Sequence, residues 1–185
     1  MADYFLETAR LGFRRWSPDD VPLALALWGD PAVTRWIGGP WSDTEVEARL
    51  TAEIERQADS GMQYWPVFLR SNGAHVGAAG LRPYRPTEAI FEIGVHLLSA
   101  YWGRGLATEA SRAVIAHAFG PLGAAALFAG HNPGNHESRR LLLKFGFSYT
   151  HDEYYVPTGL RHPSYLLGRG DWERHARSGA PTAKS

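Results

Sequence analysis

The feature that most constrains the fold is a block of three consecutive β-like runs, at residues 63–70, 74–84 and 89–98. The segments that join them, SNG and RPYRPTE, are rich in residues typical of hairpin turns. Three such runs with short connections predict an antiparallel meander. An alanine-rich run from about Leu106 to Phe119 follows and ends at Gly120, so we expect the meander to lead directly into a helix.

The segments on either side of this block predict further strands and helices. A capping box begins at Ser42, and Asn135 is placed to cap a later helix. The expected helices span residues 17–29, 30–39, 42–61 and 135–145, and the other expected strands span 8–16, 124–130, 148–156 and 162–168. The predicted fold class is therefore α/β (α+β), with a mixed, mostly antiparallel sheet of seven strands and helices on both faces.

Composition limits both the domain organisation and the classes of function. The chain has 185 residues without repeat or linker, so we expect one domain, with a core at about 8–172 and a frayed tail at 178–185. Its 19 basic and 19 acidic side chains cancel, which removes a global electrostatic argument for nucleic acid or an anionic membrane. No apolar stretch reaches the ~20 residues of a membrane helix, and we expect a cytoplasmic protein.

The absence of cysteine excludes several chemistries outright. Disulfides, thiolate nucleophiles, iron–sulfur clusters and cysteine zinc sites all require a residue that this chain lacks. His131 and His136 are five positions apart across a Pro-Gly turn and have no obvious third ligand, so no metal is expected.

The segment YWGRGLATEA, residues 101–110, places two glycines directly before the N-terminus of the alanine-rich helix, where the backbone is not covered by side chains. Gly105 provides no side-chain cap, so the first helical amides need an external acceptor. The small residues Gly103, Gly105 and Ala107 leave room for phosphate oxygens, the helix dipole favours an anion, and Arg104 adds a cation. The segment lacks the Walker ending and the third glycine of a dinucleotide fingerprint, and the alternative is a purely structural turn.

Two longer segments carry a family resemblance. EIGVHLLSAYWGRGLATEASRAVIAHAF and, further on, HNPGNHESRRLLLKFGF resemble the GCN5-related N-acetyltransferases, and specifically the branch of RimJ- and RimL-like ribosomal-protein N-terminal acetyltransferases. The family's pyrophosphate loop, Gln/Arg-x-x-Gly-x-Gly/Ala, falls on residues 102–107, with Trp102 in place of the usual Gln or Arg. The resemblance extends from about Thr8 to Trp172.

The resemblance implies acetyl-CoA as co-substrate, held between two splayed parallel central strands at residues 90–98 and 125–130. Its pyrophosphate would lie on the amides of residues 104–108, and a bulge at Gly94 would free backbone groups for the pantetheine arm. Arg139, Arg140 and Lys144 could meet the 3′-phosphate or could simply form a solvated helix face. The coenzyme-binding residues implied are Val95, Leu97, Trp102, Gly103, Arg104, Gly105, Ala107, Thr108 and Asn135.

Glu92 and Ser138 are the candidate catalytic residues. Strict alternation places Glu92 on the same strand face as Gly94 and His96, where its carboxylate could act as a base, directly or through water. The alternatives are that Glu92 pairs with an arginine at the rim, or that His96 is the base. Ser138 lies in the first turn of the later helix and could donate to the departing sulfur, or it could be only a capping residue.

We therefore expect an acetyl-CoA-dependent N-acetyltransferase in which a primary amine attacks the thioester directly. The acceptor is either a protein N-terminal α-amine or a small-molecule amine such as an amino acid, polyamine or antibiotic. A non-catalytic acyl-CoA-binding module is the rival function. Dimers are common among similar proteins, so a homodimer is one assembly that the resemblance allows. Six residues fall in segments that, by the resemblance, surround the acceptor; we expect most of them to be core and some to form an acceptor pocket. They are Trp36, Trp41, Trp65, Tyr154, Tyr155 and His162.

Overall fold

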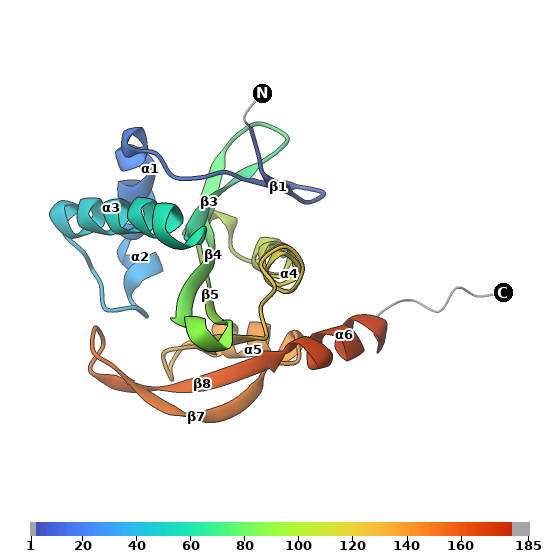
Figure 1. The fold of residues 1–185 in the computed structure, drawn as a ribbon. Helices are drawn as coiled ribbons and strands as arrows, with labels where there is room; N and C mark the ends of the chain where they lie inside the picture. Colours follow the sequence, from blue (N-terminus) through green and yellow to red (C-terminus); the bar gives the residue numbers. More distant parts are fainter. Residues whose placement is uncertain (1–2, 179–185) are drawn as a thin grey trace.

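One sheet of eight strands organises the computed structural model, which describes residues 3–178. The strand order is β1-β2-β3-β4-β5-β6-β8-β7, and every neighbouring pair is antiparallel except β5 and β6 (Figure 1). The strands are β1 (Leu6–Glu7), β2 (Leu11–Phe13), β3 (Tyr64–Leu69), β4 (His75–Arg85), β5 (Ile90–Leu97), β6 (Ala126–Gly130), β7 (Ser148–Tyr155) and β8 (Leu160–Gly168). The mixed α/β class and the β3–β4–β5 meander are thus confirmed.

The sheet has eight strands rather than seven because the expected first strand is a hairpin. Thr8 and Leu11 close a tight turn between β1 and β2: the Leu11 amide donates to Thr8 Oγ1 at 2.9 Å, and the Thr8 amide donates to the Leu11 carbonyl at 2.8 Å. A threonine side chain that bonds nearby backbone in this way offers the chain an alternative to a continuous strand.

Helices cover both faces of the sheet (Figure 1). One face carries α1–α3, which form a core around Trp28 with β3 and β4 residues, and the other carries α4, whose apolar side packs on β2, β4 and β5. The α3 capping box and the Gly61 stop are as expected, whereas a short 3-10 turn at residues 18–20 delays the start of α1 to Val21. The helices are α1 (Val21–Trp28), α2 (Pro31–Thr34), α3 (Asp43–Ser60), α4 (Leu106–Phe119), α5 (His136–Lys144) and α6 (Arg169–Ser178).

Helix α6 was not expected from the sequence. Its residues are almost all polar, so no apolar periodicity marks it, and it is held by the packing of Trp172 on Phe145 with ring centroids 6.2 Å apart. The expected tail at 178–185 lies, from residue 179 onward, outside the described residues. Within residues 3–178, none of the helices combines the length and apolar character needed to cross a membrane.

The parallel pair β5 and β6 separates after a short contact. Ile90, Phe91 and Glu92 pair with residues 126–128, and β5 then continues to Leu97 without β6 beside it. The β4–β5 register runs through this region without a shift, so the bulge expected at Gly94 is absent. A Cβ at Gly94 would lie 2.5 Å from the hydroxyl of Tyr64, and the glycine instead makes room for that ring.

Candidate active site

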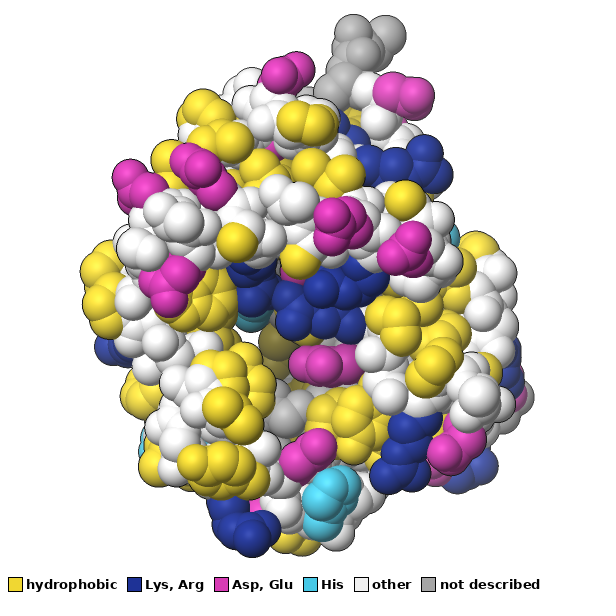
Figure 2. All heavy atoms as spheres, turned by 60° about the vertical axis from the view of Figure 1, so that its left-hand side comes forward, with side chains coloured by type: hydrophobic (Ala, Val, Ile, Leu, Met, Phe, Trp, Pro, Cys, Tyr) yellow, Lys and Arg dark blue, Asp and Glu magenta, His cyan; other side chains and the backbone are white. Residues whose placement is uncertain are grey.

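Two cavities meet where β5 and β6 separate. The glycine-loop cavity, about 440 Å³, lies between β5 and the first turns of α4 and α5. The arginine cavity, about 260 Å³, lies beside β5 and is lined from α3, α4, α5 and the β7–β8 hairpin, with Arg49 and Arg82 in its wall. Figure 2 shows a hollow with Lys or Arg side chains gathered on one wall above Asp or Glu side chains. The residues that line both cavities are Trp36, Ile37, Val95, His96, Asn135, Ser138 and Leu141.

The loop before α4 presents an uninterrupted row of free amides. Gly103 and Gly105 have φ angles of +72° and +75°, which favour glycine, and Gly105 is the N-cap of α4 without a side-chain cap. In the described part of the chain, the amides of residues 103–108 make no hydrogen bond. A would-be Cβ at Gly103 meets nothing within 4 Å, so the surface is open. These features fit a phosphate-bearing ligand at a helix N-terminus.

The free edge of β5 offers further backbone groups to the same cavity. Leu98 and Val76 form a hydrogen-bonded pair, so alternation along β4–β5 turns the backbone groups of Val95 and Leu97 away from β4, toward the gap. The indole of Trp102 donates to the Leu97 carbonyl at 2.8 Å. The Leu97 carbonyl, which was expected to accept a hydrogen bond from a ligand, is thus already bonded to Trp102. The backbone amide and carbonyl of Val95 and the amide of Leu97 remain available to a ligand.

Asn135 and Ser138 have separate roles at the start of α5. The Asn135 side chain caps the helix, because its Oδ1 accepts a hydrogen bond from the Ser138 amide at 3.1 Å. The Ser138 hydroxyl makes no hydrogen bond in the described part of the chain and lines both cavities. The capping alternative for the Ser138 hydroxyl thus finds no contact to support it.

Two of the four cations considered for the coenzyme, Arg140 and Lys144, line the glycine-loop cavity. Arg104 turns its guanidinium over the Tyr101 ring, 5.3 Å from the centroid, and does not line the cavity. Arg139 does not line it either. Lys144 Nζ lies 3.5 Å from Thr108 Oγ1, and Arg140 pairs with Glu137.

Glu92 lies in the arginine cavity on the face opposite the α4 core, as alternation predicts. Its Oε1 accepts a hydrogen bond from the Tyr64 hydroxyl at 3.3 Å. Burial raises the pKa of Glu92, while Arg82 and the Tyr64 hydrogen bond oppose the rise. Within residues 3–178 Glu92 forms no ion pair at 4 Å or less, so the geometry does not support the arginine-pairing alternative. A carboxylate whose pKa moves toward neutrality suits a base.

His96 shares this face but is a poor base. Its Nδ1 accepts a hydrogen bond from the Trp28 indole at 3.1 Å, which places any proton of the neutral ring on Nε2. Burial, aided by Arg49 and Arg82, holds the pKa of His96 well below its usual value. The ring is therefore neutral and can offer an N–H to a ligand, but it does not readily accept a proton.

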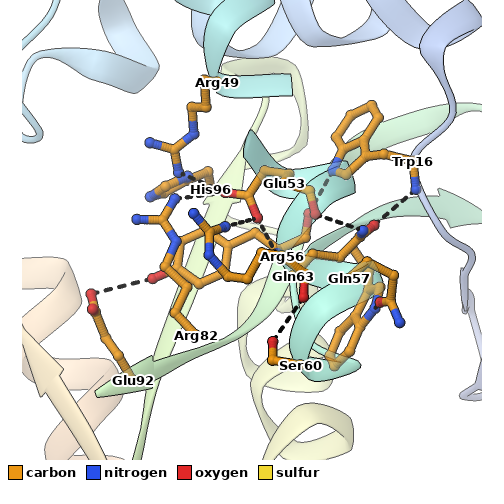
Figure 3. Close-up of polar contacts among 12 residues, drawn as sticks. Trp16, Arg49, Glu53, Arg56, Gln57, Ser60, Gln63, Arg82, Glu92 and His96 are labelled. Atoms are coloured by element: carbon orange, nitrogen blue, oxygen red, sulfur yellow. Dashed lines mark hydrogen bonds and ion pairs between the residues drawn. The ribbon is translucent and has the colours of Figure 1, made fainter. Parts of the chain in front are cut away.

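The arginine cavity contains residues that the sequence did not single out. Arg49 on α3 and Arg82 on β4 gather with Arg56 around Glu53, whose side chain is fully buried (Figure 3). The only signal in the sequence is a set of i,i+3 and i,i+4 charge pairs on α3, which is usual for a solvated helix face. Burial of these charges follows from how α3 packs on the sheet.

The expected acceptor aromatics divide into three groups. Trp36, Tyr154, Tyr155 and His162 line the arginine cavity. Trp41 does not line it, but its ring centroid lies 5.0 Å from the guanidinium carbon of Arg49. Trp65 belongs to the core on the α4 face, beside Phe5 and His117, in agreement with the expectation that most of these aromatics are core residues.

The described residues contain no group of three or more His, Asp or Glu side chains placed to hold a metal ion. His131, one of the two histidines considered, is buried and bonds the Asn132 carbonyl through Nδ1 and the Tyr165 hydroxyl through Nε2.

Comparison with known proteins finds similarity to acetyltransferases. The family profile described as acetyltransferase (GNAT) domain matches residues 10–148. The chain is 28% identical over 147 residues to YoaA, an uncharacterized N-acetyltransferase of Bacillus subtilis (strain 168), covering 77% of this chain and 81% of YoaA. It is 26% identical over 133 residues to YkkB of the same organism, covering 71% of this chain and 77% of YkkB.

Solved structures share the fold at lower identity. The acetyltransferase from Agrobacterium tumefaciens str. C58 superposes with a TM-score of 0.77 at 21% identity, covering 91% of this chain and 96% of that one. RimL, described as a ribosomal L7/L12 α-N-protein acetyltransferase and solved in complex with coenzyme A, superposes with a TM-score of 0.76 at 15% identity, covering 90% of this chain and 98% of RimL.

Proposed function

This chain belongs to the GNAT acetyltransferase family, and we propose that it transfers an acetyl group from acetyl-CoA directly to a primary amine. The observation that carries the proposal is the meeting of the two cavities at Ser138, Val95 and His96. One cavity fits a phosphate-bearing coenzyme and the other contains a carboxylate suited to deprotonate an amine. A donor and acceptor brought together at such a junction can react directly, and the chain has no cysteine nucleophile to form a covalent intermediate.

The chain's own groups fit the coenzyme. The free amides of residues 103–108 would hold the pyrophosphate, the free edge of β5 at Val95 would hold the pantetheine arm, and Lys144 is placed to meet a further phosphate. Acetyl-CoA, when bound, supplies the acetyl group as a thioester, so that a nitrogen–carbon bond forms as the carbon–sulfur bond breaks.

Two side chains would assist this exchange. Glu92 would take the proton that the amine loses, directly or through water, and its raised pKa brings it closer to that of an α-amine near ~8. The Ser138 hydroxyl, with no hydrogen bond in the described part of the chain, would donate to the departing sulfur at the start of α5.

The acceptor is either a protein N-terminal α-amine or an amine on a small molecule. The likeness to RimL is one of fold at 15% identity, so it supports the first choice only weakly. The lining of the arginine cavity, which includes Arg49, Arg82 and Glu92, bears more directly on the acceptor.

Thermal unfolding with and without acetyl-CoA tests the coenzyme site. Ligand at ~100 times its dissociation constant adds about 2.7 kcal/mol, which raises the Tm by several degrees. Adenosine is the control, and an equal shift with adenosine or none with acetyl-CoA would end the proposal.

Thiol release in the presence of amines then tests transfer. The chain has no cysteine, so a thiol reagent detects only the coenzyme product. Acetyl-CoA binding without amine-dependent thiol release, across α-amines, amino acids and polyamines, would instead identify a non-catalytic acyl-CoA-binding module.

A further inference from the structure

Three arginines surround one carboxylate beside the arginine cavity, and two of them, Arg49 and Arg82, line it. Arg82 Nη2 lies 2.6 Å from Glu53 Oε1, and Arg56 Nη1 lies 2.6 Å from Glu53 Oε2. Arg49 Nη2 is further away, at 3.5 Å from Oε1. Figure 3 shows the three side chains arriving from α3 and β4 around Glu53. One buried carboxylate thus faces three guanidinium groups.

Arg49 is held in place without being satisfied. Its guanidinium lies 4.6 Å from the Trp28 ring centroid and 5.0 Å from that of Trp41, and these rings fix its position. In the described part of the chain none of its five donors makes a hydrogen bond, and its Nε and Nη2 are closed off from solvent. The side chain keeps 15% of its surface exposed and lines the cavity, so the donors on Nη1 remain available.

Arg49 stays charged in this setting. Burial and the neighbouring Arg82 lower its pKa to about 10, which is still well above neutral pH. Burying hydrogen-bond donors without acceptors is unfavourable unless a ligand supplies the acceptors. A guanidinium with unused donors, pointing into a cavity, is suited to a carboxylate.

The balance of charge favours a monoanion. Glu53 offsets one of the three arginine charges, and Glu92, which must be ionised to act as a base, offsets a second, so that one net positive charge remains. Arg82 and Glu92 are cross-strand partners on β4 and β5, so Arg82 and the proposed base lie on adjacent strands of one face, and Arg49 on α3 lines the same cavity. Positive charge and a base side by side suit a ligand that carries a carboxylate close to its amine.

We propose that the acceptor is an amine bearing a carboxylate, which Arg49 and Arg82 bind while the amine faces Glu92. The proposal rests on the proposed function and narrows its substrate class. Two sources share this chemistry: a free amino acid, through its α-carboxylate, and a peptide whose N-terminal residue has an acidic side chain.

Matched acceptor pairs test the proposal with the wild-type protein. Free amino acids are compared with their C-terminal amides, and peptide amides that begin with Asp or Glu are compared with those that begin with Asn or Gln. Rates are expressed per unprotonated amine, because removing a carboxylate changes the pKa of the amine. The carboxylate member of one pair is expected to have a kcat/KM about 10- to 100-fold higher, the range for a hydrogen-bonded charge pair.

Those pairs also identify the source of the carboxylate. A preference confined to free amino acids assigns a small-molecule acceptor, and a preference confined to acidic peptides assigns a protein N-terminus. Equal kcat/KM values within both pairs would overturn the proposal. So would a higher kcat/KM for phosphoethanolamine, whose anionic group is a phosphate, than for β-alanine, whose anionic group is a carboxylate.

Arg49→Gln and Arg56→Gln are the matched variants. Both remove one positive charge beside Glu53 from α3, but only Arg49 lines the cavity. Arg49→Gln is expected to abolish the preference for carboxylates by lowering kcat/KM for the acid 10- to 100-fold while the amide changes little. Arg56→Gln is expected to keep the preference, and loss of the preference in both variants would show that only the general field of the cluster matters.

Binding separates this proposal from the proposed function. If no acceptor releases thiol although acetyl-CoA raises the Tm, transfer has failed and the carboxylate site is tested by calorimetric titration of each acid and amide into the coenzyme A complex. Tighter binding of the acid to wild type than to Arg49→Gln would sustain the site. Equal binding would overturn it.

Discussion

The hydroxyl of Tyr64 lies 3.3 Å from Glu92 Oε1 and donates a hydrogen bond to it. The ring reaches this position because Gly94, next along the same face of β5, has no side chain to meet it. A buried tyrosine whose pKa is raised by burial keeps its proton and remains a donor. Tyr64 therefore positions Glu92 and favours its ionised form.

Replacing Glu92 by Gln is expected to lower kcat about 10²- to 10⁴-fold, because the amine loses its proton acceptor. Steady-state thiol release measures this effect, and the Tm shift with acetyl-CoA should persist, since Glu92 lies outside the glycine-loop cavity. An unchanged kcat would remove Glu92 as the base.

Replacing Tyr64 by Phe is expected to move the acid limb of the kcat/KM profile to higher pH. The hydrogen bond from Tyr64 lowers the pKa of Glu92, so its removal raises that pKa and a higher pH is needed to ionise the carboxylate. The profile is measured between pH 5 and 9 beside Glu92→Gln, in which this limb should vanish. A shift to lower pH would contradict the assignment.

Ser138→Ala and Asn135→Ala are expected to have opposite signatures. Asn135 caps α5, so its replacement should reduce the free energy of unfolding by about 1 kcal/mol. Ser138→Ala should leave stability within about 0.5 kcal/mol. It should lower kcat about 10- to 100-fold through the lost donor to a charged sulfur. Urea unfolding measures the stability of both variants, and thiol release measures their kcat. A stability loss confined to Ser138→Ala would indicate that Ser138 is only a capping residue.

Gly105→Ala and Gly61→Ala form a matched pair for the coenzyme site. Both residues have a positive φ, +75° and +71°, at a helix terminus. Each substitution should cost about 1–2 kcal/mol through the left-handed backbone. Only Gly105→Ala should also reduce the Tm shift with acetyl-CoA, because it perturbs the free amides of the loop. Equal shifts in the two variants would argue against phosphate binding there.

Acid should destabilise the protein through His75. Burial lowers its pKa to about 4, although the backbone of Gly77 opposes the shift. Between pH 6.5 and about 4 the unfolded chain binds the proton that the folded chain refuses, so stability falls as pH decreases, by up to about 3 kcal/mol. Urea unfolding at pH 7 and 4.5 should show a smaller loss for His75→Phe, and an identical loss would exclude this origin.

Local interactions allowed much of the fold to be predicted from the sequence. The capping box of Ser42 and Glu45, the Asn135 cap and the extent of α4 depend on residues within four positions of each other, as do the strands of the meander. The Gly103–Gly105 loop follows for a similar reason, since glycine tolerates the positive φ that such a turn requires.

The tertiary structure alone decided the parts of the site that join distant segments. Tyr64 meets Glu92 across the sheet, Trp102 takes the Leu97 carbonyl, and Arg82 on β4 completes the cluster begun by Arg49 and Glu53 on α3. The sequence pattern of a charge pair at i,i+4 is the same whether the helix face is exposed or buried. Whether such a pair is buried depends on which elements pack against the helix face. Those contacts join elements that are far apart along the chain.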